Sequence, residues 1–556
     1  MKEKYIDIME KALSAYTDEH IISYFNRVKT EGLTEHGFAR LTANIGILIA
    51  HGRREDLRSL FVEMMDFCCK NMPRCKAAND FTIREILCCL MCLEEHKTFE
   101  IEKIVWWKSH FIEIDRDKCY TRFIKNADED IRNWAFFTLV SEWMRKYNGL
   151  CDTEEFVEFQ LMAQLRRFDE NGQYHDYEKN ESPYQPVIYD LVPRTLTAML
   201  LHFGYRGKYY EELRALMKKV TPLTLAFQSV NGEFAFGGRS NQFIHNEAML
   251  STFLEFAANI FYEDGDIETA KKCKAAIAMA VENMELWLSK NPIRHVKNRF
   301  PTETNFGCED YAYFDKYMIT VASNIYCAYL ICDESIPCGE PDMSPLTFET
   351  SEYFHKLVLR AGGYYLEFDV NADPHYDCSG LGRVHKIGAP SAICLSVPCP
   401  KHPNYVINVD DPADISLCPG VKCGDEWSFA TDWEYKIKEY KADENSAFAD
   451  IICRHNGAEV ISKYTLNENG VNIDVYGDGE VAFMLPAFSF DGETASEIRS
   501  TENILEIFYE DWICRYSTNG SIADLKIRGG NRNGIYEAYF AKENKNLNVK
   551  IEIIKA

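Results

Sequence analysis

The side chains best suited to binding and proton transfer gather directly after a glycine pair at Gly237 and Gly238. Within nine consecutive positions lie cationic, amide, imidazole and carboxylate groups, at Arg239, Asn241, Gln242, His245, Asn246 and Glu247. Arginine and amide groups bind a carboxylate, and histidine moves protons near neutral pH. Asn241 and His245 are four residues apart, so on a helix they share one face. The structural alternative is an arginine paired with an acid and a histidine in the core, but the density of polar groups favours a functional site.

Three further segments combine titratable and aromatic residues in loop-like contexts, at positions 174–185, 294–317 and 375–390. The second is rich in tyrosine and carboxylate, and the third combines glycine with histidine and arginine. Their candidate residues are Asp176, Tyr177, Gln185, Glu309, Asp310, Tyr311, Tyr313, Arg383 and His385. The edge of a sheet rarely carries so many glycine and basic residues unless it contacts a ligand or another domain. Each single tyrosine, in contrast, is explained equally well as a core residue.

No stretch of the sequence specifies a metal or a cofactor. His375, Asp377 and His385 have the right chemistry for metal ligands, but one short segment does not define a site. The only CxxC pair, Cys89 and Cys92, lies in an apolar helical run without a second pair. We therefore expect neither a metal nor a cofactor.

The spacing of hydrophobic residues differs between two parts of the chain. The structural elements of these two parts must position the candidate residues. Up to about residue 340 apolar residues recur at helical spacing, as in 154–165, and after about 345 they alternate, as in 364–370 and 471–476. A run of helices followed by a run of strands predicts a multidomain α-then-β chain. We expect an N-terminal (α/α)n toroid that carries the catalytic residues, at 1–345, and a C-terminal antiparallel β-sandwich at 346–556.

A weak internal repeat supports stacked helix pairs. Asn171-Gly172 and Asn231-Gly232 lie 60 residues apart, each after a helical stretch, where Asn-Gly supplies the left-handed turn that ends a helix. Helix pairs cannot bury their apolar faces alone, so they stack into an open solenoid or a closed ring. The long polar loops, rich in aromatic residues, favour the ring.

Composition narrows the class of protein. The 556 residues are 46% hydrophobic and carry a net charge of −25, which disfavours nucleic acid and anionic membranes as partners. The longest apolar runs are far shorter than the roughly 20 residues that span a membrane. The first residues lack a secretory signal, and many of the 20 cysteines sit in helical apolar runs, so we expect a cytoplasmic protein with free thiols. A homodimer is compatible with the sequence.

With these segments in place, the chain resembles the heparinase II/III-like polysaccharide lyases and their toroid-plus-sandwich relatives. In that resemblance Asn241 and His245 correspond to the Asn/His of the toroid cleft, and Tyr311 or Tyr313 to the catalytic tyrosine. The stretch from Gly380 to His385 is similar to the histidine segment of the β-domain. The Gly238-Arg239-Ser240 segment is also similar to uronic-acid-specific glycosidases of the same fold.

The resemblance implies β-elimination at a uronic acid in an anionic oligosaccharide. Arg239, Asn241 and a cationic histidine would neutralise the substrate carboxylate, whose charge grows as the neighbouring proton leaves. Tyr311 or Tyr313 would act as base and acid, His245 as a second proton-transfer group and His385 as a carboxylate binder. Gln242, Asn246, Tyr177, Gln185 and Arg383 would contact the substrate.

Two alternatives remain open at this point. An exo-acting uronide hydrolase needs two carboxyl groups, about 5–5.5 Å apart for retention or about 6.5–9.5 Å apart for inversion. Its candidates are Asp176, Glu247, Glu309 and Asp310. A non-catalytic helical scaffold is the second alternative, and the titratable clusters in both halves argue against it. Both enzymatic hypotheses require that Arg239, His245 and His385 converge around one sugar.

Overall fold

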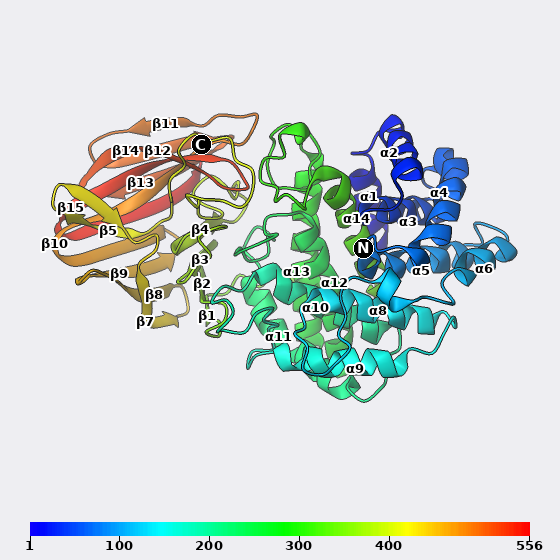
Figure 1. Ribbon diagram of the computed structural model, residues 1–556. Helices are drawn as coiled ribbons and strands as arrows, with labels where there is room; N and C mark the ends of the chain where they lie inside the picture. The colour runs from blue at the N-terminus through cyan, green and yellow to red at the C-terminus, as the bar shows by residue number, and fades with distance from the viewer.

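A helical region and a β-sheet region lie side by side (Figure 1) in the computed structural model, which describes residues 1–556. The helical region contains α1 (Lys2–Leu13), α2 (Asp18–Glu31), α3 (Gly37–Ala50), α4 (Arg58–Asn71), α5 (Asn79–Glu95), α6 (Ile101–Ser109), α7 (Arg116–Cys119), α8 (Trp134–Tyr147), α9 (Glu154–Gln164), α10 (Val187–His202), α11 (Tyr210–Phe227), α12 (His245–Glu263), α13 (Ile267–Ser289) and α14 (Phe314–Ile331). None of these helices is both long and apolar enough to cross a membrane.

Six of the helices form a closed inner ring. In the order α3, α5, α8, α10, α12 and α14 each packs against the next, and α14 packs against α3. The inner helices are buried on nearly all sides, as in α3, where Gly37 to Ile49 are all buried. The outer helix α2 instead buries one stripe, spaced at three and four residues, at Ile21, Tyr24, Phe25 and Val28. The predicted toroid is confirmed, and it is a ring rather than an open solenoid.

Buried polar groups join the ring where its first and last helices meet. Arg40 of α3 donates a hydrogen bond to Thr320 Oγ1 of α14 at 2.8 Å, and Asn44 donates to Ser323 Oγ at 2.8 Å. Arg40 also pairs with Glu85 of α5 at 3.2 Å. Because these groups are buried, leaving any of them unpaired would cost free energy. The seam between α3 and α14 is therefore chemically specific.

The β region contains two antiparallel sheets. Its strands are β1 (Leu346–Glu349), β2 (Lys356–Ala361), β3 (Tyr364–Asp369), β4 (Gly380–Lys386), β5 (Pro419–Cys423), β6 (Glu426–Phe429), β7 (Glu434–Ala442), β8 (Ala447–His455), β9 (Ala458–Asn467), β10 (Gly470–Phe490), β11 (Glu497–Ser500), β12 (Ile504–Tyr509), β13 (Trp512–Thr518), β14 (Ser521–Gly530) and β15 (Ile535–Lys555). The small sheet has the order β1-β2-β3-β4, and the large one runs β11-β12-β13-β15-β10-β9-β8-β7. Strand β14 pairs with β15, and the β5–β6 hairpin pairs with β10.

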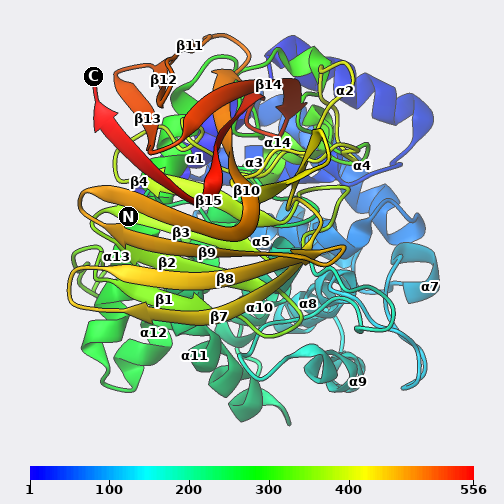
Figure 2. The same cartoon turned by 90° about the vertical axis from the view of Figure 1, so that its left-hand side faces the viewer.

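The small sheet is the middle of three layers, between the large sheet and the helices (Figure 2). Strands β2 and β3 are buried on both faces, and alternate residues face opposite sides. Leu357 and Leu366 join the core of the sandwich, whereas Val358 and Tyr365 join the core of the helical region. The predicted antiparallel sandwich is confirmed. One face of its small sheet packs against the toroid. All 20 cysteines of the chain are free thiols.

Candidate active site at the mouth of the toroid

The first turns of the inner helices meet at one end of the ring, and their aromatic side chains touch in succession. The ring of His36, just before α3, lies 5.2 Å from that of Phe81 on α5 and 5.7 Å from that of Tyr317 on α14. Phe81 lies 4.9 Å from Trp134, the first residue of α8. We call His36, Phe81 and Trp134 the aromatic arc. All three are partly exposed, so the mouth of the toroid offers flat apolar faces with polar edges.

Arg239 enters this mouth from the segment between α11 and α12. Its guanidinium carbon lies 5.0 Å from the ring centre of Tyr311 and 5.9 Å from that of Tyr189. The side chain is half-buried, its Nε has no hydrogen-bond partner, and it forms no ion pair. Arginine keeps its charge under all ordinary conditions. In a chain with 86 acidic residues, it is notable that this cation forms no ion pair.

The backbone that presents Arg239 is held in an unusual conformation. Gly237 and Gly238 have φ values of 135° and 70°, and the non-glycine residues Ser240 and Gln242 have 59° and 62°. Such conformations cost free energy in non-glycine residues and persist only where the surroundings impose them. Here the Gly238 amide donates to Asp377 Oδ2 at 2.6 Å, and the Ser240 amide donates to Glu309 Oε1 at 2.8 Å.

Tyr311 faces Arg239 and is fixed by a chain of contacts that reaches into the β region. Its hydroxyl lies 2.7 Å from Ser240 Oγ and donates to Glu309 Oε1 at 3.3 Å. Arg532, just before β15, binds the two oxygens of Glu309 at 2.6 and 2.8 Å. Burial, followed by the nearby Glu309 carboxylate, raises the pKa of Tyr311 above its usual value. The hydroxyl therefore keeps its proton near neutral pH.

His245, the first residue of α12, lies at the base of the mouth. Its ring centre is 5.8 Å from that of Tyr317, which is itself 5.8 Å from Tyr311. Only 4% of His245 is exposed, and its Nδ1 has no hydrogen-bond partner. Burial, and then the nearby His295, lower the pKa of His245 well below the usual value. His245 is therefore neutral near pH 7 and offers a lone pair, and its predicted role in proton transfer stays a prediction. We call Arg239, Tyr189, Tyr311, Tyr317 and His245 the mouth cluster.

The three amide residues predicted to bind substrate are almost completely buried. Asn241, Gln242 and Asn246 are 1%, 2% and 3% exposed. Asn241 donates to the Gly238 carbonyl, and Asn246 donates to the Ser240 carbonyl at 3.2 Å. Gln242 accepts a hydrogen bond from Asn533 at 3.4 Å. Their amides hold the strained backbone in place, while Asn241 Oδ1 and Asn246 Oδ1 have no hydrogen-bond partner, so the contact of these residues with substrate stays a prediction.

His385 and Arg383 do not reach the mouth, although both face the toroid from β4. The two ring nitrogens of His385 lie 3.1 Å from Ser229 Oγ and 3.2 Å from Ser396 Oγ. Arg383 is fully buried, pairs with Glu367 at 3.3 Å and donates to the Phe234 carbonyl at 2.8 Å. The predicted roles of His385 in catalysis and carboxylate binding, and of Arg383 in substrate binding, are corrected: both residues join the two regions.

These two residues belong to a larger set of buried charges, which we call the interdomain network. Lys297 pairs with Glu247 at 2.8 Å and with Glu233 at 3.3 Å. The members of the network are Glu233, Glu247, Lys297, Glu367, Arg383 and His385. Burial lowers the pKa of His385 to about 3, and the neighbouring Arg383 contributes in the same direction. Every charge in the network is committed to a partner within the chain.

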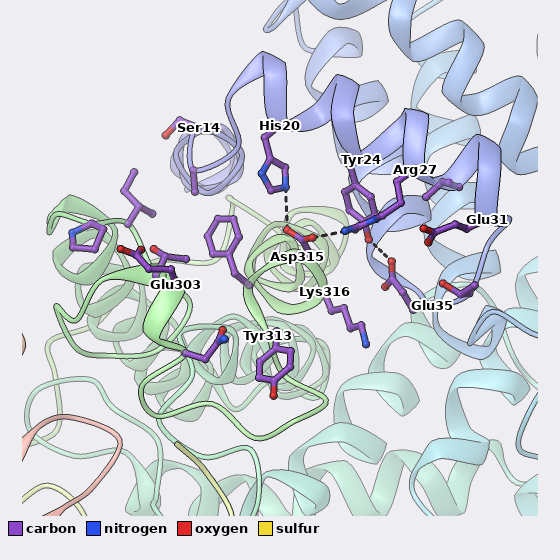
Figure 3. Close-up of a pocket in the computed structure, with 18 of the residues that line it drawn as sticks. Ser14, His20, Tyr24, Arg27, Glu31, Glu35, Glu303, Tyr313, Asp315 and Lys316 are labelled. Atoms are coloured by element: carbon purple, nitrogen blue, oxygen red, sulfur yellow. Dashed lines mark hydrogen bonds and ion pairs between the residues drawn. The ribbon is translucent and has the colours of Figure 1, made fainter. Parts of the chain in front are cut away.

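Tyr313 lies apart from Tyr311, although only one residue separates them. It is exposed, donates to Asp310 Oδ1 at 3.2 Å and lines a separate cavity of about 1060 Å³ with Asp315 and Lys316 (Figure 3). In that cavity Asp315 binds His20 at 2.9 Å and Arg27 at 3.0 Å. The expectation that Tyr313 shares the catalytic position is corrected, because Tyr313 is exposed beside Asp310 whereas Tyr311 contacts Ser240 and Glu309.

Tyr177 and Gln185 lie in the loop before α10. Tyr177 is partly exposed, and the guanidinium of Arg132 sits 4.5 Å from its ring centre. Gln185 binds the Tyr177 backbone, donating to its carbonyl at 2.8 Å and accepting from its amide at 3.1 Å. Tyr177 can therefore meet a ligand, whereas Gln185 positions it, which corrects the predicted substrate contact of Gln185.

The carboxylates proposed for a hydrolase do not form a pair. Asp176 accepts a hydrogen bond from the Asn133 amide at 2.6 Å, and Glu247 is bound by Lys297. Glu309 is bound by Arg532, and Asp310 is exposed beside Tyr313. Each of the four carboxylates therefore has a partner other than one of the remaining three. Their role in a hydrolase stays a prediction.

Comparison with known structures assigns the fold. No protein-family model matches the chain, and no curated protein matches its sequence. A chondroitin AC lyase from Streptomyces coelicolor A3 matches with a TM-score of 0.51 at 10% identity, over 99% of this chain and 79% of that chain. The chain has the toroid-and-sandwich fold of polysaccharide lyases. A second structure of that enzyme, in complex with chondroitin sulphate, scores 0.47 at 10% identity over 99% and 79% of the two chains. Heparinase III scores 0.48 at 9% identity over 93% and 76%.

Four residues at the mouth of this fold were not identified from the sequence alone. Tyr189, Tyr317, His36 and Trp134 come from four inner helices and meet only because the ring closes. A signal does exist, because an aromatic ring or histidine stands within four residues of the start of every inner helix, at His36, Phe81, Trp134, Tyr189, His245 and Tyr317. Aligning the helix starts, rather than searching for motifs, would have exposed it.

Proposed function

We propose that the protein cleaves oligosaccharides or polysaccharides containing uronic acid, by β-elimination at the mouth of the toroid. One observation carries the proposal: Arg239 is a partly exposed, unpaired cation flanked by Tyr189 and Tyr311. An anionic ligand that binds Arg239 lies beside a protonated tyrosine and above a neutral histidine. These are the groups that proton transfer next to a carboxylate requires.

The electrostatics of the mouth favour an anion despite the net charge of −25. The amino-terminal ends of the six inner helices face the mouth, and each such end carries roughly half a positive charge. Arg239 adds a full charge at the same end of the ring. Salt screens the charge of surface carboxylates that lie more than about 10 Å away at moderate ionic strength. The positive charges at the mouth therefore contribute most to the binding of an anion.

The chemistry follows from the protonation states. Arg239 neutralises the substrate carboxylate and so makes the adjacent C5 proton more acidic. The neutral His245, whose ring centre lies 5.8 Å from that of Tyr317, accepts this proton. The electron pair of the C5–H bond forms the C4–C5 double bond, and the C4–O bond to the leaving sugar breaks. Tyr311, whose pKa is raised by burial, donates its proton to the leaving oxygen.

The aromatic arc supports a sugar chain as the ligand. The ring of Phe81 lies 4.9 Å from that of Trp134 and 5.2 Å from that of His36, and all three rings are partly exposed. Tyr177, stacked under Arg132, extends the polar and aromatic surface. A flat sugar ring has an apolar face and polar edges, so it suits aromatic faces with hydrogen-bonding rims better than a compact anion does.

The test is the product that the full-length protein releases from uronate glycans. Chondroitin sulphate, heparan sulphate and unsulphated polyuronates are incubated with it, and near-ultraviolet absorbance and new reducing ends are measured together. Elimination creates a conjugated double bond, so both signals should rise in equal molar amounts. Reducing ends without absorbance would establish hydrolysis, and no product from any glycan would leave a binding scaffold as the better description.

A further inference from the structure

Two histidines and a cysteine meet at the end of the ring opposite the mouth. His51 directly follows α3, and Cys92 and His96 lie four residues apart at the end of α5, which places them on one helix face. One ligand atom from each of the three residues lies within 4.8 Å of the other two. Cys92 Sγ is 3.8 Å from His51 Nε2, and the two imidazole ring centres are 4.6 Å apart.

These spacings approach those of a tetrahedral metal site. Zinc binds sulfur at about 2.3 Å and imidazole nitrogen at about 2.0 Å, so its ligand atoms lie roughly 3.3–3.6 Å from one another. Small rotations of the three side chains close the remaining gap. The site is accessible from solvent, because His51 is half-buried and His96 is exposed, while Cys92 is buried behind them.

The surroundings favour a cation. His51 and His96 are the capping residues at the carboxyl ends of α3 and α5, and each such end carries roughly half a negative charge. The side chains of Glu3 and Glu95 add negative potential at His51, partly offset by the positive charge of Arg53. The same helix direction that makes the mouth attractive to anions thus makes the opposite end attractive to cations.

We propose that His51, Cys92 and His96 bind one thiophilic divalent cation of the Zn²⁺ type, which ties the end of α3 to the end of α5. Two imidazoles and one thiolate select zinc over magnesium or calcium, which prefer oxygen ligands. A fourth position is left for water. Because α3 and α5 already pack so closely that a methyl group on Gly46 would come 2.5 Å from Cys89 Sγ, the cation braces an existing contact.

The sequence does not show this site, because 41 residues separate His51 from Cys92. The CxxC pair draws attention to Cys89, which is buried against α3. The partners of Cys92 are the histidine four residues later and one on another helix. The site also lies at the far end of the ring from the mouth cluster, so its test does not depend on the proposed activity.

The experiment uses the full-length protein, stripped of metal with a chelator that is then removed. Cobalt(II) chloride is titrated as the spectroscopic substitute for zinc, and zinc sulphate is titrated by calorimetry. We expect one equivalent of cobalt to give a thiolate-to-cobalt charge-transfer band in the near ultraviolet together with tetrahedral visible bands. Cys92→Ser should abolish the charge-transfer band, and His96→Ala should weaken zinc binding at least about tenfold.

Matched variants separate the site from adventitious binding. Cys338→Ser removes an exposed thiol elsewhere, and His202→Ala removes an exposed histidine at the end of the inner helix α10. Both should bind cobalt and zinc as the unmodified protein does. The proposal is overturned if the unmodified protein gives no charge-transfer band, if Cys92→Ser keeps it, or if Cys338→Ser abolishes it. Circular dichroism of each variant checks that the fold is retained.

Discussion

The mouth cluster and the interdomain network contain the same kinds of side chain in opposite circumstances. Both include arginine and a histidine that burial keeps neutral. Arg239 has no ion-pair partner and is partly exposed, whereas Arg383 is fully buried and pairs with Glu367. His245 has a free Nδ1, whereas both ring nitrogens of His385 have partners. The two sets therefore differ in exposure and in ion pairing: Arg239 is half-buried without an ion-pair partner, whereas the charged groups of the interdomain network are buried and paired within the chain.

This contrast predicts a double separation of effects. Changes in the mouth cluster should remove activity and spare stability, because its groups have few partners to lose. Changes in the interdomain network should remove stability and spare the activity of the molecules that remain folded. Each of the following measurements tests one of these two expectations. A variant that lost both activity and stability would not support the separation.

The largest expected effect is on turnover in Arg239→Gln. Loss of the charge that neutralises the substrate carboxylate should lower kcat/KM by about 10³-fold, measured from product absorbance with the best glycan. The unfolding midpoint in urea should stay unchanged, since Arg239 forms no ion pair. Arg166→Gln, at an exposed position outside the mouth, is the matched control. Equal losses in both variants would contradict the assignment.

Tyr311→Phe and Tyr313→Phe form the next test. Tyr311 touches Ser240 and Glu309 in the mouth, whereas Tyr313 lines the separate cavity. Removal of the proton donor should reduce kcat by about 10²-fold in Tyr311→Phe, while Tyr313→Phe keeps full activity. If the second variant lost activity and the first did not, the catalytic position would move to the other cavity.

Arg383→Ala tests the stability side. It leaves Glu367 short of one cation and two backbone carbonyls without a donor. Breaking a buried pair of this kind should lower the free energy of unfolding by about 3 kcal/mol, measured by urea denaturation. Arg499→Ala breaks the exposed pair with Glu497 and should cost less than about 1 kcal/mol. Similar values for the two variants would mean that the network does not join the regions.

The smallest effect is the pH dependence carried by His385. Its pKa is about 3 in the folded protein and 6.5 for the free side chain, so the unfolded chain binds the proton more readily. The resulting stability is present above about pH 6.5 and is lost as the pH falls toward about 3. Between about pH 6.5 and pH 5 the loss is about 2 kcal/mol, at about 1.36 kcal/mol per pH unit. His385→Asn should flatten this part of the stability curve. A curve parallel to that of the unmodified protein would refute the assignment.

The fold could be predicted from the sequence because periodicity is a local property. Alternating and helical patterns separate the two regions without any knowledge of contacts. Closure of the ring was also favoured, through the polar loops at the helix starts. Arg239 and Tyr311 could be proposed from the sequence because their loops concentrate functional residue types within a few positions, and the structure brings these two side chains together.

The fate of the other candidates depended on partners far away in the chain. Arg532 binds Glu309 from 223 residues away, and Ser229 faces His385 across 156 residues. No local sequence pattern shows that a carboxylate or an imidazole already has a hydrogen-bond or ion-pair partner elsewhere in the chain. His385 and Glu309 therefore looked as available as Arg239 until the two regions were placed together.

The seam between α3 and α14 has a consequence for synthesis. Position 50 ends one of these helices and position 314 begins the other, a gap of 264 residues (314 − 50). At about 5–20 residues per second, a ribosome needs roughly 13–50 s to cover it. Throughout that interval Arg40 and Asn44 of the nascent chain have no Thr320 or Ser323 to bind. The partly synthesised ring therefore lacks these two hydrogen bonds until α14 has been made.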